Sequence, residues 1–161
     1  MAGTNDSKQV KVTIYTDGAA SGNPGPGGYG VVLESSAGHR KELSGGFRRT
    51  TNNRMELLAA ITGLRELKGD QLQVVVVSDS KYVVDSVNKG WLASWVKKGF
   101  KDKKNPDLWR KMVPLLEKHK PVFQWVKGHN NHPQNERCDI LAVLASKKPE
   151  LPADTGYESS L

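Results

Sequence analysis

Alternating apolar and polar positions mark the beginning of the chain. Val10, Val12 and Ile14 alternate with polar neighbours, and residues 29–33 form an apolar run after a turn rich in glycine and proline. Residues 40–47 read as a third extended segment. Alternation with a period of two is typical of strands that bury one face, so the pattern predicts an antiparallel meander of three strands.

From Asn53 onward the apolar spacing becomes helical. Leucine and isoleucine recur at positions that share one helix face, and the pattern stops near Gly69. Residues 72–77 then form a continuous, β-branched run, which is typical of a strand covered on both faces. A buried central strand is therefore expected after the first helix.

Further helices are expected over residues 80–88, from Pro106 through Leu116, and over 134–147, with a last strand at 121–126. The order β-β-β-α-β-α-α-β-α predicts an α/β fold: a mixed five-stranded sheet flanked by helices, in which strand 72–77 lies parallel to the first strand. Residues 1–161 are expected to form a single domain, with 1–8 and 149–161 as loosely held ends.

Composition narrows the class of protein. The chain carries 24 Lys and Arg against 17 Asp and Glu, a net charge of +7, which favours a polyanionic partner, most simply nucleic acid. The longest aliphatic run is four valines, so no membrane span is expected. A single cysteine and the lack of a secretory pattern at the start predict a cytoplasmic protein.

Four acidic residues each allow a local structural explanation. Asp17 precedes a glycine, as in a tight turn, and Glu56 lies three residues after an asparagine, which is the capping-box spacing. Asp79 follows the apolar strand and could cap the next helix. Asp139 lies early in the last predicted helix, where the helix dipole favours an acid.

Taken together, the same acids predict a site. Two lie at strand ends and two in opening helical turns, positions that converge at one edge of an α/β sheet. Two carboxylates at ~4 Å repel by about 4 kcal/mol at an effective dielectric of ~20, so a cluster needs a cation. Oxygen ligands suit Mg²⁺ and phosphate chemistry, and a pair of ions roughly 3.5 to 4 Å apart can assist an in-line displacement by water.

Two other motifs resemble ligand-binding patterns but fit them poorly. Residues 25–30 spell G-x-G-x-x-G, but a strand rather than a helix follows, so the stretch is interpreted as a hairpin turn and not a dinucleotide site. His129, His132 and Cys138 offer one sulfur at a spacing that fits no zinc pattern. His129, on a loop near Asp139, is better interpreted as a proton carrier.

Aromatic and basic residues interleave between positions 91 and 109. Trp91, Trp95, Phe100 and Trp109 alternate with lysines 97, 98, 101, 103 and 104. The aromatics can be core anchors beside a solvated lysine face, or the segment can be an arm that grips a duplex through its phosphates. The two interpretations are compatible, and both stay open at this point.

Several segments in order resemble bacterial ribonuclease HI, of the type 1 ribonuclease H family. They are Tyr-Thr-Asp17-Gly, the glycine-rich stretch around Asn23, Thr51-Asn-Asn-Arg-Met-Glu56, Ser-Asp79-Ser, Trp-Val-Lys-Gly-His129 and Asn-Glu-Arg-Cys-Asp139, within residues 10–157. The resemblance implies a ribonuclease H-like fold and a monomeric endonuclease that cuts the RNA strand of RNA–DNA hybrids. It further implies one or two Mg²⁺ or Mn²⁺ ions per site, and 5′-phosphate and 3′-hydroxyl products.

The resemblance also assigns roles by matching position. Asp17, Glu56, Asp79 and Asp139 would be the metal-binding catalytic carboxylates, and His129 would assist proton movement and product release. The expected substrate contacts fall into groups: the minor groove (Asn23, Asn52, Asn53), a phosphate pocket for the DNA strand (Arg49, Thr51, Asn105), the DNA-strand channel (Trp91) and the basic arm (Lys97, Lys98, Lys101). Gly18, next to Asp17, is expected to contact the substrate as well. Lys81 stands where the family has a glutamine, so a phosphate contact is expected to replace a minor-groove hydrogen bond.

Two rival hypotheses predict other features. A binding module that has lost catalysis would lack at least one of the four acids, and none is missing. A strand-transfer enzyme of the integrase or transposase type would add further domains, for which 161 residues leave little room.

Overall fold

Three long strands open the fold and pair as the predicted antiparallel meander. The computed structural model describes residues 9–69, 71–128 and 132–161, and its first strands are β1 (Lys11–Ala20), β2 (Gly25–Ser35) and β3 (Arg40–Thr50). All three are longer than the apolar alternation indicates. Because β1 runs on to Ala20, Asp17 pairs with Gly30 inside the sheet, and the tight-turn explanation of Asp17 is wrong.

Two parallel strands complete the sheet. Strand β4 (Gln73–Ser78) pairs in parallel with β1, and β5 (Val122–Trp125) pairs in parallel with β4. The order across the sheet is β3-β2-β1-β4-β5, so the predicted mixed five-stranded α/β sheet is confirmed. Strand β4 lies inside the sheet, between β1 and β5, and its Val74, Val76 and Val77 are buried, as their continuous apolar run predicts.

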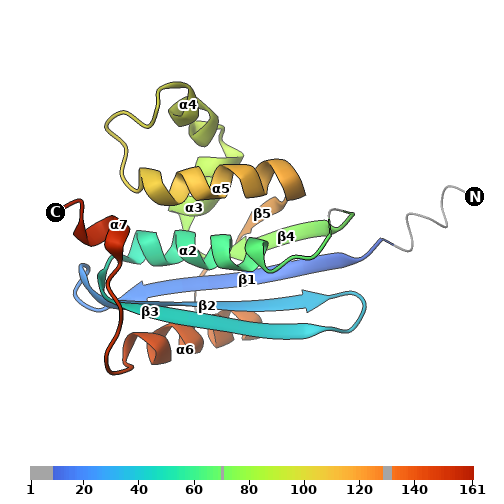
Figure 1. The fold of residues 1–161 in the computed structure, drawn as a ribbon. Helices are drawn as coiled ribbons and strands as arrows, with labels where there is room; N and C mark the ends of the chain where they lie inside the picture. Colours follow the sequence, from blue (N-terminus) through green and yellow to red (C-terminus); the bar gives the residue numbers. More distant parts are fainter. Residues whose placement is uncertain (1–8, 70, 129–131) are drawn as a thin grey trace, which may run out of the picture.

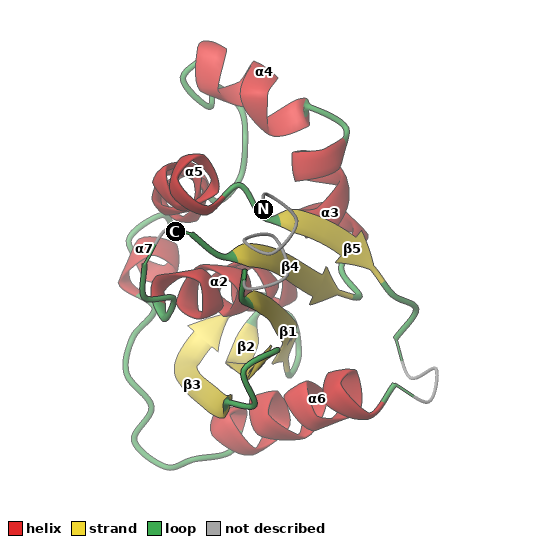
Figure 2. Cartoon of the chain, turned by 90° about the vertical axis from the view of Figure 1, so that its right-hand side faces the viewer, coloured by secondary structure: helices red, strands yellow, loops and turns green. Residues whose placement is uncertain are grey.

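Helices cover both faces of this sheet. Helix α2 (Asn52–Arg65) packs on β1 and β2, and α5 (Pro106–His119) packs on the outer side of α2. Helix α6 (Pro133–Ser146) covers the opposite face across β1, β2 and β3, as Figures 1 and 2 show. Helix α3 (Lys81–Asn88) lies beside β5. No helix in the described ranges has the length and apolarity needed to cross a bilayer.

Glycines of the glycine-rich stretch let α6 lie directly on the backbone of β2. A Cβ at Gly30 would stand 2.2 Å from the Cys138 carbonyl oxygen, and one at Gly28 would stand 2.3 Å from that of Ala142. No side chain fits into either gap. The stretch is thus part of a strand and its hairpin, as predicted, and its glycines serve close packing.

Two short helices were not predicted: α4 (Trp91–Lys97) and α7 (Thr155–Glu158). The prediction that residues 149–161 are loosely held is wrong. The backbone N–H of Arg48 donates to the Pro152 carbonyl at 2.9 Å, and Asp154 is buried. Figure 1 shows this segment crossing the edge of the sheet to bring α7 beside the start of α2. The polar composition misled because Asp154 pairs with the buried Arg54 inside the protein. Residues 1–8 lie outside the described part of the chain.

Candidate active site

Three carboxylates from three elements meet at one edge of the sheet. Asp17 lies near the end of β1, Asp79 directly follows β4, and Glu56 lies in the second turn of α2. Each offers an oxygen, and these oxygens all lie within 4.8 Å of one another. Adjacent parallel strands place Asp17 and Asp79 at the same edge, and α2 brings Glu56 over β1.

Gly18 allows that close approach of α2 to β1. A Cβ at this position would stand 2.4 Å from both the Glu56 nitrogen and the Met55 carbonyl carbon. Any side chain here would push α2 away and would separate Glu56 from Asp17. The structure therefore gives Gly18 a packing role, while its expected contact with substrate stays a prediction.

The capping explanations of the acids are wrong. Thr51 caps α2, its hydroxyl accepting from the Arg54 N–H at 3.3 Å, so Glu56 forms no capping box with Asn53. Ser80, not Asp79, caps α3 by accepting from the Val83 N–H at 3.2 Å. Since neither acid is used at a helix end, their convergence needs another reason.

Burial makes the cluster costly when no cation is present. Asp17 is 6% exposed and Glu56 is 9% exposed. Burial first, and then the charge of Asp79, raise the pKa of Asp17 from 3.8 to about 8. Burial and the charges of Asp17 and Asp79 likewise raise the pKa of Glu56 well above its ordinary value.

The oxygens of this cluster fit a hard divalent cation. Glu56 Oε1 and Asp79 Oδ1 are buried and accept no hydrogen bond from any described residue. A buried acceptor without a partner loses solvation that a cation restores. The donor set contains only carboxylate oxygens, which matches Mg²⁺ or Mn²⁺ better than a thiophilic metal.

Asp139 faces the same cluster from α6. Its charge contributes to the raised pKa of Asp17, although it lies outside the group of three. Helix α6 begins at Pro133, so Asp139 lies in its second turn, where the helix dipole has little effect. The dipole explanation therefore does not account for this acid.

The zinc interpretation finds no support among the described residues. Burial raises the pKa of the Cys138 thiol, so the sulfur remains protonated. His132 caps α6 through Nδ1, which accepts from the Asn135 N–H at 3.3 Å. His129, the expected proton carrier, lies outside the described residues.

The asparagines expected to read the minor groove form one exposed ridge beside the cluster. Asn23 Oδ1 accepts from the Asn52 N–H at 3.0 Å, and Asn52 Oδ1 accepts from the Ala20 N–H. Asn53 is exposed next to them. Because the amide oxygens bind the protein, the amide NH₂ groups of Asn23 and Asn52 remain donors for a ligand.

A groove of about 820 Å³ runs between this ridge and the basic segment, which is the lysine-rich and aromatic stretch of residues 91–109. Thr51 and Asn105, two of the three expected phosphate-pocket residues, line it, together with Lys103 and Lys104. Arg49, the third, is exposed at the end of β3, outside the residues that line the groove. The C-terminal residues Ser159 and Ser160 form part of its wall, which sequence reasoning missed.

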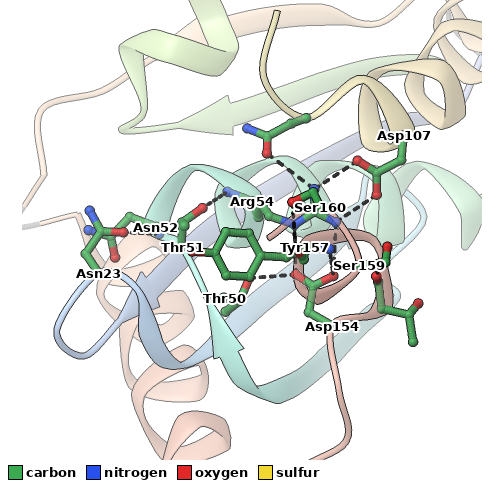
Figure 3. Close-up of polar contacts among 12 residues, drawn as sticks. Asn23, Thr50, Thr51, Asn52, Arg54, Asp107, Asp154, Tyr157, Ser159 and Ser160 are labelled. Carbon is green, nitrogen blue, oxygen red and sulfur yellow. Dashed lines mark hydrogen bonds and ion pairs between the residues drawn. The ribbon is translucent and has the colours of Figure 1, made fainter.

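Arg54 joins the groove to the rest of the fold, as Figure 3 shows. Its guanidinium is buried and donates to the carboxylates of Asp154, at 2.8 and 3.0 Å, and of Asp107, at 2.9 and 2.7 Å. The Thr50 hydroxyl donates to Asp154 at 2.7 Å. The sequence hinted at this network only through the position of Arg54, which follows two asparagines and directly precedes the apolar positions of a helix.

The basic segment combines both interpretations of its residues. Trp109 is fully buried and packs edge-on against Trp95 with centroids 5.7 Å apart, and Phe100 is buried. The aromatics thus anchor the segment, whereas its lysines are exposed: Lys97, Lys98, Lys101, Lys103 and Lys104. Trp91 differs, because it is 44% exposed at the start of α4 and is available to a ligand.

Sequence reasoning also missed an exposed tryptophan beside the carboxylates. Trp125 ends β5, is 42% exposed and donates its indole N–H to the Asp79 carbonyl at 3.0 Å. Lys81, exposed at the start of α3, lies over its ring. A tryptophan at the end of an edge strand could have been recognised as a candidate functional residue, because such a side chain has no neighbouring strand on one side to cover it.

Comparisons with known proteins agree with this geometry. A family model described as RNase H matches residues 9–147. A ribonuclease H of Desulforamulus reducens is 57% identical over 157 residues, covering 94% of this chain and 98% of that protein. The crystal structure of LC9-RNase H1, a type 1 RNase H with the type 2 active-site motif, is similar with a TM-score of 0.78 at 33% identity, covering 94% of this chain and 81% of that one. The structure of LC11-RNase H1 in complex with an RNA/DNA hybrid has a TM-score of 0.63 at 32% identity, covering 83% of this chain and 95% of that one.

Proposed function

This chain belongs to the RNase H family, and from that premise we propose that it hydrolyses the RNA strand of RNA–DNA hybrids at the carboxylate cluster. The observation that carries the proposal is the convergence of oxygens from Asp17, Glu56 and Asp79 within 4.8 Å of one another. Two of the buried oxygens, Glu56 Oε1 and Asp79 Oδ1, accept no hydrogen bond within the described structure. Such an arrangement is unfavourable unless it holds a cation.

Asp17, Glu56 and Asp79 would hold divalent cations, Mg²⁺ or Mn²⁺, with Asp139 completing the set. When bound, the ions supply activation of the attacking water and stabilisation of the leaving 3′-oxygen in an in-line displacement. The products would be a 5′-phosphate and a 3′-hydroxyl end.

Side chains of the protein would hold and transfer the protons of the reaction. Asp17 and Glu56 have raised pKa values, so the metal-free cluster retains protons near neutral pH and releases them when a cation binds. We assign His129 to proton transfer during turnover, because an imidazole titrates near neutral pH.

Discrimination would depend on both strands. The free amide NH₂ groups of Asn23 and Asn52 point hydrogen-bond donors at the minor groove, where an RNA strand adds its 2′-hydroxyls. The groove lined by Thr51, Asn105 and two lysines suits a phosphate of the DNA strand. Trp91 and the lysines of the basic segment extend this contact along the duplex.

A substrate panel tests the proposal. A labelled RNA strand is offered paired to DNA, paired to RNA, or single, with Mg²⁺ and with EDTA. We expect cleavage of the hybrid only, dependent on the metal. Asp17→Asn serves as the matched control that retains the fold and the positive surface.

Binding of the hybrid without any cleavage in Mg²⁺ or Mn²⁺ would contradict the proposal and would make this protein a binding module. Equal cleavage of all three substrates would contradict the proposed recognition of the hybrid.

A further inference from the structure

Trp125 lies at the active-site edge of the sheet with no assigned role. It is the last residue of β5 and pairs with Ser78, the residue before Asp79. Its ring is 42% exposed, and its indole N–H donates to the Asp79 carbonyl oxygen at 3.0 Å. The hydrogen bond fixes the ring against the backbone of a proposed metal ligand.

Lys81 lies over the face of this ring. The Lys81 ammonium is 4.8 Å from the Trp125 ring centroid, a distance at which a cation is attracted by the π-system. Within the described structure, Lys81 forms no ion pair with a carboxylate, although Asp79 lies only two residues before it in the chain. A neutral aromatic face therefore holds this ammonium without neutralising its charge.

We propose that Trp125 is a positioning residue that holds Lys81 at the edge of the carboxylate cluster, where Lys81 binds a backbone phosphate of the hybrid. The inference rests on the proposed function and adds to it a positioning residue and a binding contact. An ammonium is a compact point charge that suits a phosphate, whereas reading a base edge favours a flat amide or a fork of donors. An ion pair with an acid would have removed the same charge from use.

The two contacts of the indole are separable by substitution. Trp125→Leu removes both the aromatic face and the N–H donor. Trp125→Phe retains a face for Lys81 but removes the hydrogen bond to Asp79. Lys81→Gln removes only the charge.

The test measures hybrid binding to the full chain in Ca²⁺ over a series of salt concentrations, together with KM and kcat in Mg²⁺. We expect Lys81→Gln and Trp125→Leu each to raise KM by about threefold to tenfold and to lower the slope of log affinity against log salt by about one. We expect the double variant to be no weaker than Lys81→Gln alone, because Trp125 acts on binding through Lys81. Trp125→Phe should retain the KM of the parent protein and lower kcat.

Lys118→Gln is the matched control, since it removes one exposed positive charge at the other end of the sheet. We expect its KM and salt slope to equal those of the parent protein. Thermal unfolding checks each variant, and Trp125→Gln replaces Trp125→Leu if the latter unfolds.

Two results would overturn the inference: additive losses in the double variant, or an unchanged salt slope in Lys81→Gln. Failure of the proposed function is a different result, because the parent protein itself would then leave the hybrid intact while the binding measurements could still be made.

Discussion

A single residue shows how strongly the fold changes side-chain chemistry. The Asp17 carboxyl has an ordinary pKa of 3.8, and burial beside Asp79 raises it to about 8. The same group would be a solvated anion in a turn. Its value to the site therefore comes from where β1, β4 and α2 meet.

Asp17→Asn should abolish metal-dependent cleavage and leave the metal-free protein as stable or more stable. The substitution removes a metal ligand and relieves repulsion between buried carboxylates. Cleavage assays and thermal unfolding in EDTA check both parts. A clear drop in melting temperature would contradict the electrostatic account.

Metal-free stability should depend on pH with a definite sign. The folded protein keeps a proton on Asp17 at pH values where the unfolded chain has lost it, so protons favour folding. We expect the free energy of unfolding in EDTA to fall by about 1 kcal/mol or more between pH 5 and pH 8. Urea unfolding measures it, and Asp17→Asn should show a weaker fall.

At the scale of elements, the C-terminal segment acts as a brace. Asp154 caps α7 and binds the buried Arg54, which also holds Asp107 at the start of α5. Three elements far apart in the chain are thereby joined at the N-terminal end of α2. Arg54 and Asp107 of this junction line the groove that we assign to a DNA phosphate.

Asp154→Ala should destabilise the protein by about 3 kcal/mol, because it leaves a buried guanidinium with one partner fewer. Glu158→Ala is the control: it removes an exposed ion pair with Arg48, which solvent screens, and should lower stability far less than Asp154→Ala. Denaturant unfolding compares the two. Equal losses would mean that the network in the interior contributes no more than a surface pair.

Close packing at Gly18 makes a second prediction about elements. Gly18→Ala should lower stability by about 1 to 3 kcal/mol and weaken metal binding, since the new methyl group would displace α2 and Glu56 from β1. Calorimetry with Mg²⁺ or Mn²⁺ measures the binding. Gly46→Ala is the control, because its methyl group would meet the Ala145 carbonyl oxygen near the C-terminal end of α6, away from α2 and from Asp139. Unchanged metal affinity in Gly18→Ala would contradict the role of this contact.

At the scale of the whole molecule, the net charge of +7 is distributed so that the basic segment flanks the groove. Phosphate contacts from mobile lysines favour ground state and transition state alike, so they act on KM more than on kcat.

Replacing Lys97, Lys98 and Lys101 together by Ala should raise KM several-fold, flatten its salt dependence and leave kcat nearly unchanged. The matched control replaces Lys11, Lys118 and Lys120, which surround a separate hollow at the other end of the parallel strands. Steady-state kinetics over a salt series compares the two. An equal effect of both triple variants would mean that the basic segment contributes only through the net charge of the protein and not through local phosphate contacts.

Local patterns were sufficient for most of the elements. The alternation around Ile14, the helical spacing after Asn53 and the β-branched run of β4 each predicted an element that the structure contains. Strand ends were less certain, because residues 25 to 28, three glycines and a proline, carry no apolar pattern although they belong to β2. The short helices α4 and α7 were not predicted, because each has too few turns to show a helical period of apolar residues.

Sequence alone determined most of the helices and strands, the mixed sheet and the set of acids that a cation could bring together, because hydrophobic periodicity and residue chemistry are local properties. Only the tertiary structure decided that oxygens of the buried Asp17 and Glu56 and of the half-buried Asp79 lie within reach of one ion. It also decided that Asp154 binds Arg54 and that Lys81 lies over the Trp125 ring. These contacts join residues far apart in the chain. Their distances and solvation depend on how β1, β4, α2 and the C-terminal segment pack, and no local pattern encodes that.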